Sequence, residues 1–171
     1  MYKRQDGEAR AFEALYEALS PRLLGYFRRA GASPEVASDL VQQTFLRLHL
    51  ARGRYRRDAP VRPWVFMIAT NLLTDERRRS GRASERAFGE GEEEDLPAPE
   101  PDPGLPVELT EALQKALEAL PPQQRQVVLL HKYEGMPLQE VAMVTGSTLA
   151  AVKVRAFRAY EALRRAMGGT R

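Results

Sequence analysis

The chain has 171 residues, a formal net charge of +3 and no cysteine. This length fits one domain of ordinary size or two small ones, and the lack of cysteine excludes disulfides and thiolate metal sites. Because no apolar run approaches the ~18 residues of a membrane-spanning helix and the first residues carry no export signal, we expect a cytoplasmic protein.

The charged residues are strongly segregated along the chain. Residues 47–82 carry ten arginines against three acids, a balance of +7, whereas residues 83–105 carry eight acids against one arginine, a balance of −7. From residue 150 to the C-terminus, six bases stand against one acid. This pattern predicts two basic bodies joined by an acidic tether.

Four helices are expected in the first half of the chain. Serine followed by proline at positions 20 and 33 starts the second and third helices, because proline is tolerated in the first helical turn, and Gly31 ends the second. The fourth begins at Pro63. Apolar stripes at helical spacing support the first, third and fourth. They contain Phe12, Leu15, Tyr16 and Leu19, then Val36, Leu40, Phe45 and Leu48, then Trp64, Ile68 and Leu72.

A domain boundary is expected between residues 80 and 105. This segment combines an acidic run with prolines at positions 97, 99, 101 and 103, and it has few side chains that could build a core. No part of the chain shows the alternation of a β-strand. We therefore predict an all-α fold with two small helical domains, residues 8–80 and 107–168, joined by a flexible acidic linker at residues 81–106.

The second domain ends in a pattern typical of a helix-turn-helix. Two helices are expected at 107–120 and 123–133, and another begins at Leu138. Gly146 fits a left-handed helix C-cap, and Thr148 stands where the N-cap of the next helix belongs. That last helix is basic and fits a DNA major groove. A helical hairpin with a solvated basic face is the alternative, but the turn residues favour a reader of nucleic acid.

Two motifs, in a fixed order, carry a resemblance to a known family. Residues 37–48 read ASDLVQQTFLRL, and residues 62–71 read RPWVFMIATN, with three arginines at 77–79. They resemble region 2 of bacterial sigma-70 factors of the extracytoplasmic-function (ECF) group. Residues 120–159, with EVA at 140–142 and VK at 152–153, resemble region 4 of the same group. The resemblance covers about 150 of the 171 residues.

The resemblance implies a sigma factor that directs core RNA polymerase to promoters and melts the −10 element, without catalytic residues, metal, cofactor or small-molecule substrate. Region 2 would bind the clamp helices of the β′ subunit, and region 4 the β flap and the −35 element. It also implies an anti-sigma factor as partner. The sequence of residues 151–156 resembles that of a subset of the ECF group. The anti-sigma factors of this subset are membrane proteins, which would hold the chain at the inner membrane.

Residue by residue, the resemblance assigns three sets of contacts. The positions that match the polymerase-docking face are Asp39, Leu40, Gln42, Gln43 and Phe45. The positions that match the −10 DNA path are Arg54, Tyr55, Arg62, Trp64, Asn71, Arg77 and Arg78. The positions that match the −35 recognition helix are Thr148, Ala150, Ala151, Lys153, Val154, Arg155 and Arg158.

Several of these residues also have plain structural interpretations. Tyr55 could stack on an extruded base or fold onto its own domain, and Trp64 lies on the apolar stripe, which favours a core anchor with one exposed edge. The arginines at 77–79 could complement the helix dipole instead of lining phosphates. The polar positions on the docking helix could form an ordinary solvated face.

Two other functional classes compete with a sigma factor. A plain DNA-binding regulator would need a sensor in the first half of the chain, but this half has no Gly-rich phosphate loop and no strand with receiver carboxylates. An enzyme would need a catalytic or metal constellation. The only histidines, His49 and His131, have no metal-ligand spacing around them, so we expect no enzyme activity.

Overall fold

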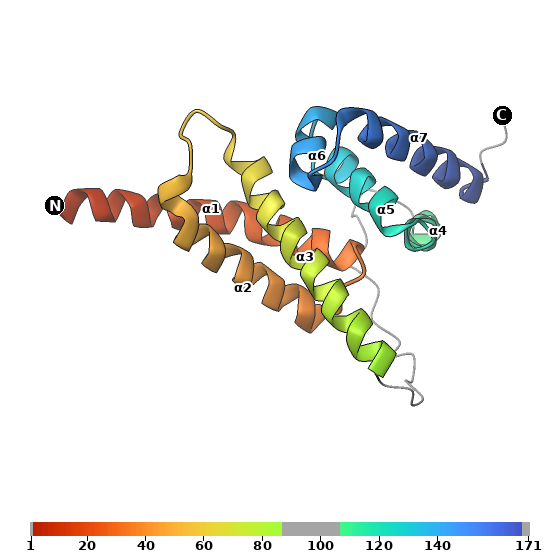
Figure 1. Cartoon of the computed structure of the whole chain (residues 1–171), viewed down its shortest axis with the longest axis horizontal. Coiled ribbons are helices and arrows are strands. Elements are labelled where there is room, and N and C mark those ends of the chain that lie inside the picture. Colours follow the sequence, from red (N-terminus) through yellow and green to blue (C-terminus); the bar gives the residue numbers. More distant parts are fainter. Residues whose placement is uncertain (1, 87–106, 169–171) are drawn as a thin grey trace.

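The computed structural model describes residues 2–86 and 107–168 (Figure 1). The N-terminal unit is three helices, with α2 packed between the other two and a short 3-10 turn before the third. These elements are α1 (Tyr2–Arg29), α2 (Pro34–Ala51), η1 (Arg52–Arg54) and α3 (Val61–Arg86). The C-terminal unit contains α4 (Val107–Glu118), α5 (Pro122–Val128), the π-helical turn η2 (Leu129–Tyr133), α6 (Leu138–Thr145) and α7 (Leu149–Ala166).

The described residues contain no strand, so the all-α prediction is confirmed. The expected linker begins at residue 81, but α3 continues to Arg86. The rest of the expected linker, residues 87–106, lies outside the described residues.

The prediction of two helices before Gly31 was wrong, because α1 runs unbroken through Pro21. Proline has no N–H to donate, so the helix loses one backbone bond there. Leu19 and Leu23, on either side of Pro21, are both buried in the same core. Their burial on one face offsets the lost bond, since packing contributes more to helix stability than local propensity does. Gly31 ends α1 as predicted, with φ +99°.

The predicted helix-turn-helix geometry is confirmed in α6 and α7. Gly146 takes the left-handed conformation, with φ +63°, and the Ser147 N–H donates to the Ala142 carbonyl at 3.0 Å. Thr148 caps α7, because its Oγ1 accepts a hydrogen bond from the Ala151 N–H at 3.2 Å. Val152 is fully buried beneath the turn and fixes α7 against α6.

The helix expected at 123–133 changes pitch at Leu129, where the Glu134 N–H bonds to the Leu129 carbonyl in π-helical fashion. The four consecutive residues from Val127 to Leu130 are all buried. One face of an ideal α-helix cannot bury four consecutive side chains. Here Val128 packs into a small cluster with α4 and α7, while the other three join a larger core.

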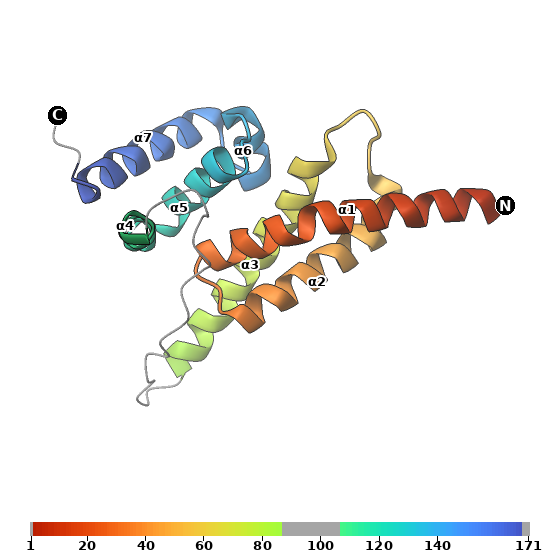
Figure 2. The ribbon, with the colours of Figure 1, turned by 180° about the vertical axis from the view of Figure 1, so that it is seen from behind.

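That larger core extends across both units. It joins buried residues of α1, α2 and α3 to those of α5, η2, α6 and α7, and α3 contacts α6. Figures 1 and 2 show the C-terminal unit lying against α1 and α3. The described parts of the chain therefore form one closed arrangement.

We expect Gly146→Ala to destabilise the C-terminal unit by about 1–2 kcal/mol, because an L side chain in the left-handed conformation is strained. Chemical denaturation would measure the change. Gly53→Ala is the matched control, since Gly53 has no positive φ and an added Cβ there meets nothing within 4 Å. Equal effects of the two substitutions would contradict the explanation.

Candidate nucleic-acid and protein interfaces

The loop before α3 forms an aromatic stack. The rings of Tyr55 and Trp64 lie 5.1 Å apart with an interplanar angle of 21°. The Tyr55 hydroxyl donates to the Ala59 carbonyl at 2.5 Å, and Trp64 packs against the core. Both rings are half-buried. Both rings therefore pack onto their own domain, and part of the surface of each remains exposed.

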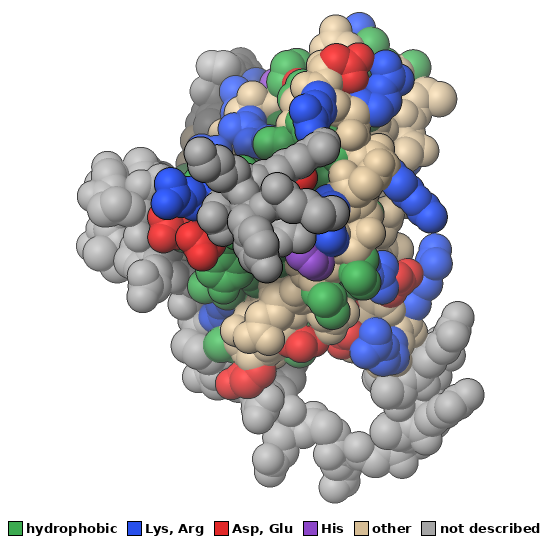
Figure 3. Space-filling view, turned by 90° about the vertical axis from the view of Figure 1, so that its left-hand side faces the viewer, with side chains coloured by type: hydrophobic (Ala, Val, Ile, Leu, Met, Phe, Trp, Pro, Cys, Tyr) green, Lys and Arg blue, Asp and Glu red, His purple; other side chains and the backbone are tan. Residues whose placement is uncertain are grey.

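A cavity of about 360 Å³ opens beside this stack. Its walls come from both units: the loop and the start of α3 on one side, and α6 on the other. The wall from α6 consists of Glu140, Met143 and Val144. The cavity thus lies where the two units meet, beside the contact of α3 with α6. We call this contact surface between the units the seam. Figure 3 looks at the end of the molecule that carries this loop, and shows Lys and Arg side chains interspersed with hydrophobic ones over the upper part of the face.

The other residues expected on the −10 path fall into two groups. Arg54, Asn71 and Arg78 are exposed. Asn71 and Arg78 are seven residues apart in α3, so they share one face of the helix. Arg62 and Arg77 are half-buried, and each guanidinium already donates a hydrogen bond to a backbone carbonyl. The Arg77 guanidinium donates to the Ala30 carbonyl at 2.7 Å, and its burial lowers its pKa. Arg62 donates across the seam to the backbone carbonyl of Glu134.

The outer face of α7 carries the residues expected to read a groove. Lys153, Val154 and Arg158 are exposed, as are Thr148 and Ala150 at the start of the helix, whereas Ala151 is half-buried. Arg155 is also half-buried and donates to Ser147 Oγ at 2.6 Å, so it braces the turn in this arrangement.

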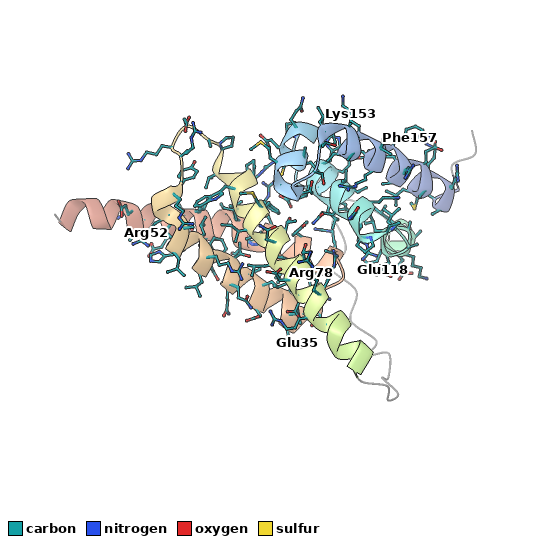
Figure 4. The ribbon with its side chains drawn as sticks, viewed as in Figure 1. Glu35, Arg52, Arg78, Glu118, Lys153 and Phe157 are labelled. Carbon is teal, nitrogen blue, oxygen red and sulfur yellow. The ribbon has the colours of Figure 1, made fainter. Side chains whose placement is uncertain are left out.

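Phe157 belongs to the same face and was not in the sequence-based set. It is 67% exposed, and it projects with Lys153 away from the rest of the protein (Figure 4). Its position four residues after Lys153, off the buried stripe of α7, is the signal that could have identified it.

The outer face of α2 differs in part from the expected docking face. Asp39 and Gln42 are exposed, and half-buried Gln43 donates from its amide to the Asp39 carboxylate. Leu40 and Phe45 are buried, and the Phe45 ring packs 4.6 Å from that of Tyr16. These two residues therefore cannot contact a partner directly, because they lie on the inner face of the helix.

Two apolar side chains take their place on the outer face. Leu46 is 59% exposed and Leu50 is 73% exposed. Both lie at helical spacing from Asp39 and Gln42. The exposed face of α2 is thus a mixed polar and apolar surface.

Glu134 is a buried acid at the seam. Its side chain is 6% exposed, and one carboxylate oxygen lies 3.8 Å from the Arg22 guanidinium. Arg29 places its guanidinium 4.5 Å from the centre of the neighbouring Tyr133 ring. Burial raises the pKa of Glu134, and the nearby cations of Arg22, Arg62 and Arg29 lower it only in part.

Two further side chains of the C-terminal unit cross the seam. Gln126 donates to the Tyr26 hydroxyl at 3.3 Å, and this hydroxyl also lies 3.0 Å from Thr70 Oγ1. Arg125 reaches the Ala30 carbonyl at 3.5 Å and also donates to the Glu118 carbonyl. The polar contacts across the seam are thus made largely by arginine and amide groups.

Within the described residues, no group of three or more His, Cys, Asp or Glu side chains could hold a metal ion. His131 donates from Nδ1 to the Met136 carbonyl at 2.7 Å, and the His49 ring packs edge-on against Phe12. Among the helices of residues 2–86 and 107–168, none has the length and apolar character needed to cross a membrane.

Comparisons with known proteins agree on one family. The model of sigma-70 region 2 matches residues 15–83, and that of sigma-70 region 4 matches residues 110–163. The RNA polymerase sigma factor CarQ of Myxococcus xanthus is 34% identical, over 98% of this chain and 95% of CarQ. The ECF RNA polymerase sigma factor SigF of Caulobacter vibrioides is 33% identical, over 95% of this chain and 89% of SigF.

A solved structure shares the fold. The sigma factor RpoE from Bartonella quintana, crystallised with the anti-sigma factor NepR, gives a TM-score of 0.82 at 23% identity. The match covers 94% of this chain and 99% of RpoE.

The contact between the two units should strengthen as the pH falls. Because burial raises the pKa of Glu134 above its ordinary value of 4.5, the closed arrangement binds a proton more tightly than separated units would. The gain appears as the pH falls through the raised pKa. The groups that face Glu134 are the guanidinium cations of Arg22, Arg29 and Arg62 and the hydroxyl of Tyr26, whose pKa burial also raises, so that it stays neutral.

Pulsed electron resonance between spin labels can measure this dependence. The chain has no cysteine, so Ala18→Cys and Ala162→Cys, both at exposed positions, supply the only two labelling sites. Glu134→Gln should remove the pH dependence, because an amide takes up no proton in this range. An unchanged dependence in that variant would assign the effect to another group.

Proposed function

Since this chain belongs to the sigma-70 family, in the ECF group of RNA polymerase sigma factors, we propose a division of promoter recognition among its surfaces. The chain directs core RNA polymerase to promoters and initiates transcription. The observation that carries the proposal is the placement of two exposed basic surfaces on separate helical units: the loop and α3 of region 2, and α7 of region 4. Run-off transcription with core polymerase on a promoter library tests it.

The surface on region 2 is proposed to capture the −10 element as single-stranded bases. Stacking on an aromatic ring contributes about 1–3 kcal/mol per base, which offsets the few kcal/mol needed to unstack a base from the duplex. The exposed edges of Tyr55 and Trp64 supply the stacking surface. Arg54, Asn71 and Arg78 lie around it or along α3 and can contact phosphates and base edges. Arg62 and Arg77 can join them only after leaving their present carbonyl partners.

The outer face of α7 is proposed to enter the major groove of the −35 element. Lys153 and Arg158 offer the cationic donors that guanine edges and phosphates accept, and Val154 and Phe157 offer apolar surface. Phe157 is exposed between the basic residues Lys153 and Arg158, and its ring can contact the methyl group of a thymine. In this proposal Arg155 orients the turn through Ser147 and approaches the phosphates.

The outer face of α2 is proposed to bind core RNA polymerase at the clamp helices of the β′ subunit. Leu46 and Leu50 would supply apolar contact area, and Asp39 and Gln42 would fix the position of the clamp helices along α2. Region 4 is proposed to reach the β flap. We expect no catalytic residue in the chain, because the polymerase performs the chemistry.

An anti-sigma factor is proposed as a second partner. The cavity on the seam has walls from both regions, so a segment inserted there would hold the regions together. That the solved RpoE is bound to NepR is a property of that protein, and the proposal for this chain depends on the cavity. Action in the cytoplasm, with retention at the inner membrane by such a partner, completes the proposal.

Replacing Asp39 and Gln43 with Arg should abolish association with core polymerase. The substitutions reverse the charge of the α2 face, and like charges placed across an interface cost several kcal/mol. Co-purification with core polymerase measures the effect, and circular dichroism checks the helical content. The matched control is Glu111→Arg with Ala112→Arg, an equal charge change at exposed positions of α4. Equal recovery of both variants with core would refute the docking face.

The two DNA-reading surfaces should fail at different steps. Arg158→Ala should weaken binding of duplex −35 DNA by about 1–3 kcal/mol if the side chain contacts a base. Asn71→Ala should leave duplex binding intact and impair promoter opening, because its partner becomes available only after the strands separate. Permanganate footprinting on a linear promoter and on a pre-melted −10 bubble separates the two steps. Normal opening of the linear promoter by Asn71→Ala would show that Asn71 is structural.

A further inference from the structure

Two methionines lie on opposite walls of the cavity beside the aromatic stack. Met67 belongs to α3 in region 2, and Met143 belongs to α6 in region 4. Met143 is 69% exposed and Met67 is 36% exposed, whereas Met136 is fully buried in the core. Small solutes therefore reach the side chains of Met67 and Met143 but not that of Met136.

Neither exposed methionine helps to build the core of the described residues. The buried core side chains, and the partly buried ones that pack against them, include neither Met67 nor Met143. In α6 the core is supplied by Val141, Ala142 and Val144. A chemical change at the two exposed methionines would therefore alter the cavity and leave the core intact.

The two methionines account for part of the apolar surface of the cavity. Its other walls are mainly aromatic rings and prolines, with three charged side chains, Arg54, Arg56 and Glu140. Asp58 already binds Arg56 at 3.0 Å. A thioether is flexible and apolar and packs well against aromatic rings, whereas a sulfoxide is polar. Oxidation on both walls would therefore make the cavity unfavourable for an apolar occupant.

We propose that Met67 and Met143 form a reversible oxidation site, at which hydroperoxides convert the thioethers to sulfoxides and thereby lower the affinity of the cavity for apolar groups. The sulfur attacks one oxygen of the peroxide, so a sulfur–oxygen bond forms and the oxygen–oxygen bond breaks. The proton of the transferred oxygen passes to the departing oxygen, which leaves as water or an alcohol. The sulfur loses two electrons, and the peroxide gains them.

The consequence for regulation rests on the insertion of a partner segment into this cavity, as proposed above. Oxidation of the cavity walls would weaken that binding and so release the chain to core polymerase. Methionine sulfoxide reductases, one for each sulfoxide epimer, reverse the modification. The modification and its effect on the cavity do not depend on the partner, so both can be measured with the chain alone.

Trp64 makes the state of the cavity observable. It is the only tryptophan of the chain, it lines the cavity and it stacks on Tyr55. Anilinonaphthalene sulfonate, a dye that binds exposed hydrophobic surface, accepts excitation energy from a nearby tryptophan. Excitation of Trp64 in the full-length chain therefore detects dye bound in or near the cavity. Leu50→Gln is the control for dye on other apolar surface, since Leu50 is 73% exposed on α2.

Hydrogen peroxide is the oxidant for the test, and peptide mass spectrometry locates the added oxygen. Met143 and Met67 should be oxidised at least several-fold faster than Met136. The dye fluorescence excited through Trp64 should fall several-fold as these two sites are modified, while the circular dichroism of the chain stays unchanged. Treatment with the two reductases should restore the fluorescence.

Substitutions separate the two thioethers from other targets of peroxide. The double variant Met67→Leu with Met143→Leu keeps apolar walls of similar volume, so it should bind the dye normally and keep binding it after peroxide. Met143→Gln places a polar group on the wall and should weaken dye binding without peroxide, more than Leu50→Gln does. Met167→Leu is the matched control, because Met167 does not line the cavity, and its dye signal should still fall after peroxide.

Three results would overturn the inference. If Met67 and Met143 are oxidised no faster than Met136, they are not a selective site. If the oxidised chain binds the dye as strongly as before, or if the double leucine variant loses the signal to the same extent, the thioethers do not control the cavity. These assays contain neither polymerase nor promoter, so failure of the proposed sigma-factor role would appear separately, in run-off transcription.

Discussion

Burial of the helix formed by α5 and η2 from two sides is the constraint on which the arrangement of the protein depends. Val128 faces α4 and α7, whereas Val127, Leu129 and Leu130 face the core shared with region 2. A small helical unit by itself buries little apolar surface. Because this helix packs against other helices on both sides, it buries more apolar surface and so stabilises region 4 beyond what its own core provides. The π-turn allows this, because it rotates the following residues relative to an α-helix.

The arginines of this chain occupy two kinds of position, half-buried and exposed, that their sequence context does not distinguish. Arg77 and Arg125 both reach the Ala30 carbonyl at the end of α1, where backbone oxygens lack helical partners. Arg54 and Arg78 remain exposed. Part of the basic composition therefore serves internal capping, and the net charge of a segment overstates the number of cations that are free to bind nucleic acid.

The contact between the two regions combines apolar packing with polar groups. Buried core residues of both regions meet there, and Arg62, Gln126 and Arg125 donate hydrogen bonds across it. Glu134 is buried among arginines at this contact, and its burial raises its pKa, so the strength of the contact should depend on pH. The aromatic stack of Tyr55 and Trp64 is already formed in this arrangement, so a base bound there would require little local reordering.

The sequence by itself determined the class of fold and the local caps and turns of the chain. The helical spacing of apolar residues, the Ser33 and Thr148 caps and the left-handed Gly146 all follow from chemistry within a few residues. The ordered motifs likewise identified the family. These features are local, so one sequence is enough to read them.

The tertiary structure alone decided which candidate residues are exposed and how the two regions meet. Leu40 and Phe45 turned inward, while Leu46, Leu50 and Phe157 turned outward, because the packing of α2 and α7 fixes which stripe of each helix is buried. The continuity of α1 through Pro21 depends on its packing into the shared core, and the burial of Glu134 among arginines depends on partners more than 40 residues away in the sequence. Contacts over such separations leave no periodic signal in the chain, and so only the assembled core could show them.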